Sequence, residues 1–199
     1  MKWEESDAII EQMIKGSTGE LWGVKLEQSD HFLLLSHALN HVGIEGDLID
    51  VGCGAGDVSR IWDGNYKGVD LDWVIERVSK VCNPGNDYIS MNLEIENVKE
   101  LPKARVALMN AFLDVRSDPH EMFEELLKLD IGNLIVHRQR LSQNSSSIDF
   151  RPGYGNTSVP SSVMSLDKIV ADVENFSPGA KISLFHWQQD YYTFVVRKS

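Results

Sequence analysis

The chain has 199 residues, 42% of them hydrophobic and 25% charged, which suits one domain able to bury a core. Its formal net charge of −11 disfavours a nucleic-acid partner and an anionic membrane surface. The two cysteines are too few for a disulfide framework, the N-terminus does not resemble a secretory signal, and no apolar run is long enough to span a bilayer. Together these features predict a cytoplasmic location.

The N-terminal part of the chain predicts two helices separated by a glycine-rich break. Residues 7–15 form a weak helical pattern, and residues 26–42 place apolar side chains on one arc at the helical period. The glycines within 16–23 interrupt the two patterns. We therefore expect residues 1–45 to be an N-terminal helical cap and residues 46–199 to be the main domain.

From residue 47 onward, predicted strands and helices alternate. Apolar runs predict strands at 48–51, 66–70, 87–91, 105–110, 133–138, 180–187 and 191–197. Helical patterns lie at 57–62, 72–81, 118–129 and 165–176. This alternation predicts an α/β fold, with a seven-stranded, mostly parallel, twisted sheet and helices on both faces. The short link at 188–190 makes the last strand antiparallel.

A glycine-rich loop follows the first strand of this sheet and contains Gly52, Gly54 and Gly56. In such folds, ligands bind beyond the carboxyl ends of the strands, so the loop lies where a ligand is expected. Asp57 stands where a dinucleotide fingerprint requires glycine, which disfavours a nucleotide-dependent oxidoreductase. Asp70 ends the second strand, where an acid accepts hydrogen bonds from ribose hydroxyls. The predicted ligand is a nucleoside without phosphates.

The segments "DVGCGAG" (50–56) and "GVDLD" (68–72) resemble the first two motifs of the class I S-adenosylmethionine-dependent methyltransferases. The resemblance continues through "ISMNLEIENV" (89–98), "ARVALMNAFLDVRSDP" (104–119), "GNLIVHRQRL" (132–141) and the final predicted hairpin. It covers residues 47–199. It implies a Rossmann-like domain that binds S-adenosylmethionine (SAM) and releases S-adenosylhomocysteine (SAH).

The resemblance also implies which residues contact the cofactor. In the order of the chain, these are Asp50 near the amino group, Gly52, Cys53 and Gly54 along the methionine portion, Asp70 at the ribose, Leu71, Asn92 and Leu93 at the adenine, and Asn110 at the methionine end. Asn92 stands where the family often has aspartate, and its amide oxygen can still accept a hydrogen bond from the adenine amino group.

The acceptor side of the site is less defined by the sequence. His137, at the end of the fifth predicted strand, is the candidate general base, with His120 and His186 as alternatives. An amine or thiolate acceptor would require no dedicated base. His37 and His41 have metal-ligand spacing without an evident third ligand, so no metal site is expected.

A long polar segment, 142–162, is predicted as a loop that covers the substrate, with Arg151 and Tyr154 as candidate contacts and Trp3 and Trp22 as candidates to complete the cover. The fourth-strand loop reads "NAFL" (110–113), without the two prolines typical of enzymes that methylate base or glutamine amines. With the acidic charge, this favours a small-molecule acceptor. A protein or RNA methyltransferase and a SAM-binding module without catalysis are the alternatives, and the oligomeric state stays open.

Overall fold

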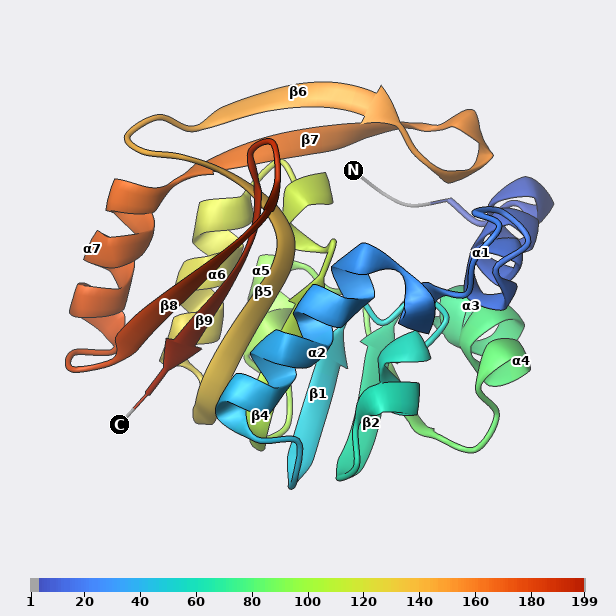
Figure 1. Ribbon diagram of the computed structural model, residues 1–199, viewed down its shortest axis with the longest axis horizontal. Coiled ribbons are helices and arrows are strands. Elements are labelled where there is room, and N and C mark those ends of the chain that lie inside the picture. The colour runs from blue at the N-terminus through green and yellow to red at the C-terminus, as the bar shows by residue number, and fades with distance from the viewer. Residues whose placement is uncertain (1–3, 199) are drawn as a thin grey trace.

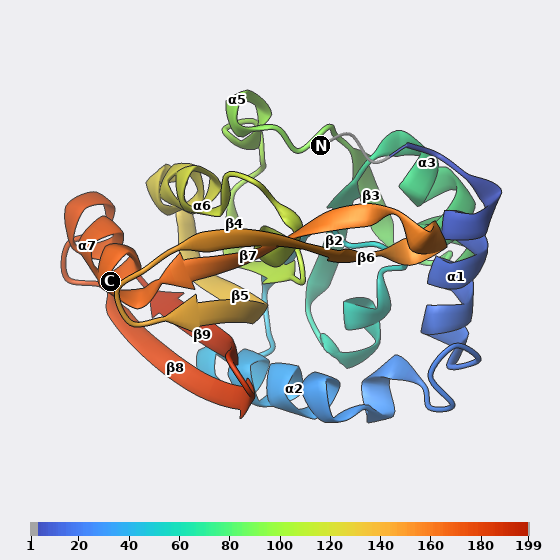
Figure 2. The same ribbon diagram turned by 90° about the horizontal axis from the view of Figure 1, so that it is seen from above.

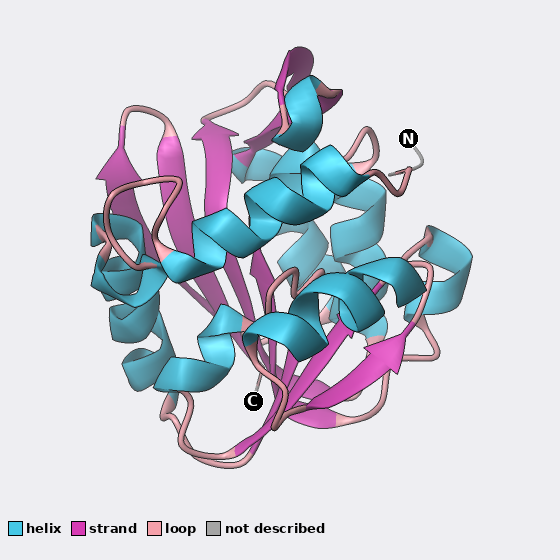
Figure 3. Ribbon diagram, turned by 90° about the vertical axis from the view of Figure 1, so that its right-hand side faces the viewer, coloured by secondary structure: helices cyan, strands magenta, loops and turns pink. Residues whose placement is uncertain are grey.

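The computed structural model describes residues 4–198, so Trp3 lies outside the described part. A twisted mixed sheet of nine strands lies between helices (Figures 1 and 3). The strands are β1 (Asp47–Val51), β2 (Asn65–Asp70), β3 (Asp87–Ser90), β4 (Ala104–Asn110), β5 (Ile131–Ser142), β6 (Ser147–Pro152), β7 (Ser158–Ser165), β8 (Lys181–Gln188) and β9 (Tyr191–Arg197).

Helices connect most of these strands. The α-helices are α1 (Asp7–Thr18), α2 (Asp30–Val42), α3 (Asp72–Val74), α4 (Lys80–Cys82), α5 (Ile95–Val98), α6 (Pro119–Lys128) and α7 (Leu166–Phe176). Five short turns complete the set: η1 (Leu26–Gln28), η2 (Asp57–Ile61), η3 (Ile75–Ser79), η4 (Leu113–Val115) and η5 (Tyr154–Asn156). The turn η3 is π-helical and joins α3 to α4 in one continuous helix. None of the described helices is both long and apolar enough to cross a bilayer.

The seven predicted strands form the main part of the sheet, in the order β3-β2-β1-β4-β5-β9-β8. The first five pair in parallel, whereas β9 runs antiparallel to both β5 and β8. The predicted fold class is therefore confirmed. The central strand β4 is buried over four consecutive residues, as expected for a parallel strand covered by helices on both faces. All five parallel strands end at one edge of the sheet, which we call the carboxyl edge.

The prediction of a loop at 142–162 is wrong, because most of this segment forms the antiparallel strands β6 and β7. This hairpin, residues 147–165, is called the strap below. It crosses the carboxyl edge from the side of α7 to that of α1 (Figures 1 and 2). Its serines and prolines obscure the strand pattern, yet seven of the eight residues of β7 are buried. The polar side chain of Ser162 can be buried because its hydroxyl donates a hydrogen bond to the carbonyl of Leu113 at 2.9 Å.

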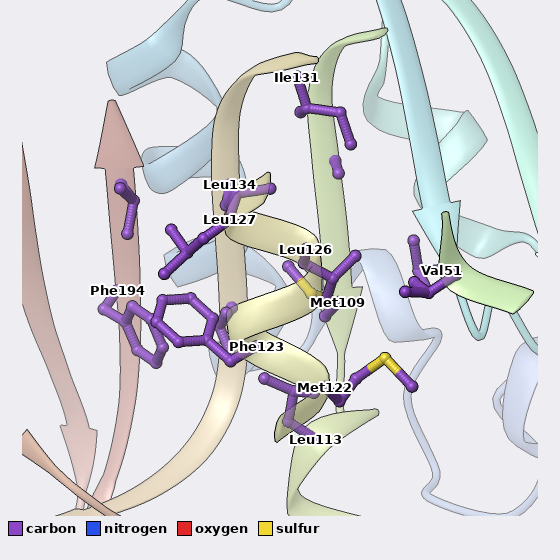
Figure 4. Packing of buried hydrophobic residues seen from close by; sticks show 14 of the residues in the cluster. Val51, Met109, Leu113, Met122, Phe123, Leu126, Leu127, Ile131, Leu134 and Phe194 are labelled. Carbon is purple, nitrogen blue, oxygen red and sulfur yellow. The ribbon is translucent and has the colours of Figure 1, made fainter. Parts of the chain in front are cut away.

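The main hydrophobic core lies between the sheet and helices α6 and α7, and Figure 4 shows its centre. Met122 and Phe123 of α6 are fully buried against Met109 of β4 and Phe194 of β9. The rings of Phe123 and Phe194 meet edge to face, with centroids 5.6 Å apart. This packing holds the carboxyl ends of β4 and β5 in fixed positions.

The two N-terminal helices lie in different places. Helix α2 covers the opposite face of the sheet, where Leu35 and Leu39 pack in one cluster with Leu48 of β1. Because α2 leads back into β1, its first turn lies at the carboxyl edge (Figure 1). Helix α1 packs instead on the helix after β2, through Ile10 and Val78.

Candidate active site

The glycine loop after β1 needs its glycines for two reasons. Gly52, Gly54 and Gly56 all adopt left-handed backbone angles, with φ of 72°, 53° and 77°. A Cβ atom on Gly52 would lie 2.6 Å from the ring of Phe112, and one on Gly56 would lie 2.6 Å from the hydroxyl of Tyr88. A Cβ on Gly54 would meet only a methyl group of α1, at 3.5 Å. Of the three glycines, Gly54 therefore has the most free space beside its Cα atom.

Asp70 is fixed at the end of β2 by the loop itself. Its Oδ2 accepts a hydrogen bond from the Gly54 amide at 2.8 Å, and its Oδ1 accepts one from the Leu71 amide at 2.7 Å. Burial raises the pKa of this half-buried carboxyl to about 6, although the two amides oppose that shift. Each oxygen keeps a further lone pair, so the carboxylate can accept two more hydrogen bonds from a ligand.

Two buried acceptors on β1 and β4 have no hydrogen-bond partner among the described residues. They are Oδ1 of Asp50 and Oδ1 of Asn110. Asp50 pairs with Leu108, two residues before Asn110, so both side chains leave the same face of the sheet. The Tyr66 hydroxyl donates to the other oxygen of Asp50 at 2.8 Å, and burial raises the pKa of Asp50 to about 7. Unsatisfied buried acceptors of this kind suit a ligand that donates hydrogen bonds.

Other predicted cofactor residues turn their side chains elsewhere. The Cys53 thiol lies beside Gly68 of β2 and 3.9 Å from the hydroxyl of Ser79, and burial raises its pKa. Leu93 is buried in the main core. Only the backbone of these two residues is left to face a ligand.

The remaining two predicted cofactor residues follow the carboxyl ends of β2 and β3. Leu71 is partly buried against the cluster of α1 and α3. Asn92 lies in the segment after β3, and its carbonyl accepts from the side chain of Asn97 at 2.9 Å. The Met91 amide donates to the carbonyl of Asp70 at 2.8 Å, which joins this segment to the end of β2.

His137 is buried, with a side chain that takes part in a chain of polar groups. Its Nδ1 lies 2.6 Å from Oγ1 of Thr193, and its Nε2 lies 3.4 Å from Nδ1 of His31. His137 is only 1% exposed, whereas His31, in the first turn of α2, is half-buried. Burial lowers the pKa of His31 to about 4, with a further contribution from the charge of Arg138, and it lowers the pKa of His137 well below its usual value. Both imidazoles are neutral at pH 7.

Arg151 and Tyr154 both lie on the strap. Arg151 forms an ion pair with the buried carboxylate of Asp114 through Nη2, and its Nη1 donates to the Tyr191 hydroxyl at 2.6 Å. Tyr154 is half-buried, and its hydroxyl lies 3.6 Å from the position of a Cβ on Gly16 in α1. The structure thus brings Arg151 to the loop after β4 and Tyr154 to the helical cap.

Helix α1 forms hydrogen bonds with both the end of the glycine loop and the strap. The Ser17 hydroxyl donates to Oδ1 of Asp57 at 2.6 Å, and the Gly155 amide donates to Oε1 of Gln12 at 2.8 Å. Trp22, after α1, is 59% exposed. Together α1, the strap and the Phe112 ring cover the carboxyl edge. Two surface hollows, of about 410 and 250 Å³, lie elsewhere: one along α1 near Arg77, and one between the ends of α6 and α7.

The sequence predicts His31 as either a helix-start histidine or a substrate-facing residue of the cap, and it gives Phe112 and Arg138 no defined role. His31 lies 106 positions from His137, so no local spacing connects the two. The sequence marks Phe112 only as part of a loop that lacks the proline motif, not as the ring that packs on Gly52. Arg138 has a left-handed backbone, with φ of 62°, which no sequence pattern predicts.

Comparison with solved structures identifies the fold. An amino pentose methyltransferase from Micromonospora echinaspora, involved in calicheamicin biosynthesis and solved with SAM bound, is similar over 100% of both chains, with a TM-score of 0.62 and 11% identity. DesVI of Streptomyces venezuelae is similar over 99% of this chain and 100% of its own, with a TM-score of 0.61 and 10% identity. A SAM-dependent methyltransferase from Mesorhizobium loti gives a TM-score of 0.62 and 12% identity, over 87% of this chain and 100% of its own.

No protein-family model matches the chain, and no curated protein matches it at a significant level. The structural matches are numerous and span the full length at low identity. The chain has the class I SAM-dependent methyltransferase fold.

Proposed function

We propose that this protein is a SAM-dependent methyltransferase that methylates a small molecule. One arrangement supports this most directly: the glycine loop, the fixed carboxylate of Asp70 and the unsatisfied acceptors of Asp50 and Asn110 lie along one edge of the sheet. SAM carries a donor at each matching place, since it has ribose hydroxyls and an ammonium group. The division into a helical cap, 1–45, and a SAM-binding domain, 46–199, belongs to this proposal.

In this proposal the predicted cofactor residues act in two groups. Asp70 accepts from the ribose hydroxyls, while Leu71, Asn92 and the backbone of Leu93 border the adenine. Asp50, Asn110 and the backbone of Gly52, Cys53 and Gly54 hold the methionine portion. When bound, SAM supplies an electrophilic methyl group on a sulfonium and leaves as SAH. The ring of Phe112 packs on Gly52, so it has to move aside for the cofactor.

The imidazole pair receives the proton of the acceptor. SAM would supply the methyl group, and a neutral imidazole would accept the proton that the acceptor atom loses on methylation. His137 is buried, so it acts on the acceptor only through its contact with His31. Thr193 fixes the orientation of the His137 ring. His31 is then the catalytic residue and His137 its positioning residue. Holding the reactants in line contributes about 7–11 kcal/mol to lowering the barrier.

A small acceptor fits the cover better than a macromolecule. The strap and α1 contact one another across the carboxyl edge, which restricts access to the site. The net charge of −11 opposes an RNA substrate. Among the similar structures, the enzyme from Micromonospora echinaspora is an amino pentose methyltransferase.

Calorimetry with SAM, SAH and NAD tests the proposal. We expect SAM and SAH to bind and NAD not to bind. Asp70→Asn should weaken SAH binding about 10–100-fold, because it removes a charge-assisted acceptor. Asp72→Asn is the matched control: it makes the same charge change two residues away, where the Asp72 carboxylate accepts from Ser90. Equal SAH affinity in the two variants, with unchanged melting temperatures, would exclude the ribose assignment.

A further inference from the structure

The side chain of Arg138 has no hydrogen bond or ion pair with any other described residue. Arg138 lies on β5 just after His137, which pairs with the last residue of β4. Its Nε is completely buried and unpartnered. The residue as a whole is half-buried, so part of the guanidinium is still accessible. A buried donor without a partner destabilises the fold, and more so when it belongs to a charged group. Such a cost is expected where a ligand completes the bonding.

The backbone at Arg138 is also held in an unfavourable conformation. Its φ of 62° lies in the left-handed region, which is unfavourable for an arginine because its Cβ approaches the carbonyl oxygen. The pairing of β5 with β9 shifts register between Val136 and Gln139, so Arg138 sits in a bulge. Ala111, next to it at the end of β4, has a φ of 52°. Bulges and strained residues concentrate at functional sites, where they aim a side chain.

The titratable groups that respond to the charge of Arg138 indicate that this charge lies at the proposed acceptor site. Its charge lowers the pKa of His31 in α2 and of His137 in β5. It also lowers the pKa of Asp114 in η4 and of Tyr154 in η5, in each case against a larger upward effect of burial. His137 precedes Arg138 on β5, and the other three groups come from three further elements, α2, η4 and η5. Arg138 therefore lies between the imidazole pair, the loop after β4 and the strap.

No carboxylate among the described residues is bonded to this arginine. Asp114 is the nearby acid: its Oδ2 is paired with Arg151, and its buried Oδ1 has no hydrogen-bond partner among the described residues. The charges of Asp114 and Arg151 cancel, and both histidines are neutral, so one positive charge remains. The net charge of −11 repels anions from the protein as a whole, so only the local charge of Arg138 favours an anion at this point.

We propose that Arg138 binds an oxyanion of the methyl acceptor, so that the substrate is a small molecule carrying a carboxylate or a phosphate. The planar guanidinium fork matches both groups. The proposal rests on the proposed methyltransferase function. It also links substrate binding to catalysis: the bound anion offsets the charge that suppresses protonation of His31, and the imidazole becomes a better base once the acceptor is in place.

Arg197 provides a matched control within the same chain. Its Nε is likewise buried and unpartnered among the described residues, but it pairs with Asn133 at the opposite end of β5. The first experiment records the Nε–Hε signals of the arginines by NMR, in protein saturated with SAH. Sodium phosphate or sodium acetate is then added stepwise to the protein. A parallel titration with sodium chloride at the same ionic strength is the control. Arg138→Gln and Arg197→Gln assign the two signals.

We expect the Arg138 signal to shift saturably with phosphate, acetate or both, and the Arg197 signal to follow the chloride control. Saturation by phosphate alone indicates a phosphate ester, and saturation by acetate indicates a carboxylate. Equal responses of the two arginines, or no response of Arg138, would overturn the proposal. Because SAH binding is measured in the same sample, this result is distinct from failure of the proposed function.

A second experiment examines the product. The protein is incubated with methyl-labelled SAM and a small-molecule cell extract, and the labelled product is passed over an anion exchanger. We expect the exchanger to retain it. Arg138→Gln should lower its formation at least about 30-fold without changing SAH affinity, whereas Arg197→Gln should not. A labelled product that contains neither a carboxylate nor a phosphate would contradict the proposal that Arg138 binds an oxyanion while leaving the methyltransferase proposal intact.

Discussion

Nε2 of His137 lies 3.4 Å from Nδ1 of His31, although the two residues are far apart in the chain. The contact forms because α2 runs antiparallel to β1 and brings its first turn to the end of β5. Thr193 of β9 holds the far nitrogen of His137 at 2.6 Å. Three elements thus align two neutral imidazoles beside the proposed acceptor site.

Replacement of His31 tests the role of this pair. We expect His31→Ala to lower kcat about 10²–10⁴-fold, the usual contribution of a general base, with SAH affinity unchanged. His41→Ala is the control, since His41 lies at the other end of α2, beside the exposed hydroxyl of Ser183 and the ring of Phe185. Equal kcat values in the two variants would remove His31 from the mechanism.

The pH dependence of kcat/KM gives an independent measure of the same pair. Burial and Arg138 lower the pKa of His31 to about 4, so the neutral base persists well below pH 6.5. We expect the acidic limb of the profile to lie closer to pH 4 than to the ordinary histidine value. Thr193→Val removes the partner of His137 and should shift this limb. A purely structural role of Thr193 would leave the limb in place.

Asp50 should destabilise the fold at neutral pH. Its folded pKa is raised from 3.8 to about 7, so the folded state binds more protons than the unfolded state between these values. Stability contributed by this group therefore falls as pH rises from about 4 to 7. We expect Asp50→Asn to increase the free energy of unfolding at pH 8 by at least about 1 kcal/mol and to weaken SAH binding. Urea unfolding at pH 4.5 and pH 8 measures the effect.

Asp47→Asn is the control for that comparison, because Asp47 lies on the same strand but is exposed and bonded to Asn65. In Asp47→Asn, the difference in the free energy of unfolding between pH 4.5 and pH 8 should be the same as in the unmodified protein. A stability gain in Asp50→Asn that is equal at both pH values would argue against a raised pKa of Asp50.

The glycine loop allows packing to be separated from ligand binding. In Gly56→Ala the new methyl group meets the Tyr88 hydroxyl at 2.6 Å, so we expect a loss of about 1–3 kcal/mol in stability. In Gly54→Ala only the backbone angle is strained, at about 1 kcal/mol, but the methyl group occupies the open face. For the same loss in free energy of unfolding, Gly54→Ala should thus weaken SAH binding more than Gly56→Ala does. Thermal melting and calorimetry on both variants decide this.

The ring of Phe112 should slow cofactor entry, because it packs directly on Gly52. We expect Phe112→Ala to raise the association rate of SAH, measured by stopped-flow fluorescence. Phe150→Ala serves as the control, since Phe150 lies on the strap with 66% of its surface exposed. An association rate that is the same in both variants and in the unmodified protein would show that the ring is no obstacle.

Local patterns in the sequence determined seven of the strands of the sheet and the proposed cofactor side of the candidate site. An apolar run, three glycines and an acid at the next strand end depend on spacing within about 25 residues, so local spacing is enough to place Gly52, Gly54 and Asp70 together. The alternation of strands and helices likewise predicted the parallel sheet, because connection length restricts the topology.

The proposed acceptor side depends on tertiary structure alone. The strap could not be recognised from its serines and prolines, since its burial comes from packing on β5 and η4. The contact of His31 with His137, and the unpartnered charge of Arg138 at a bulge, arise where distant segments meet at the ends of strands. Side-chain direction and partnership at such points depend on long-range register, which local periodicity does not encode.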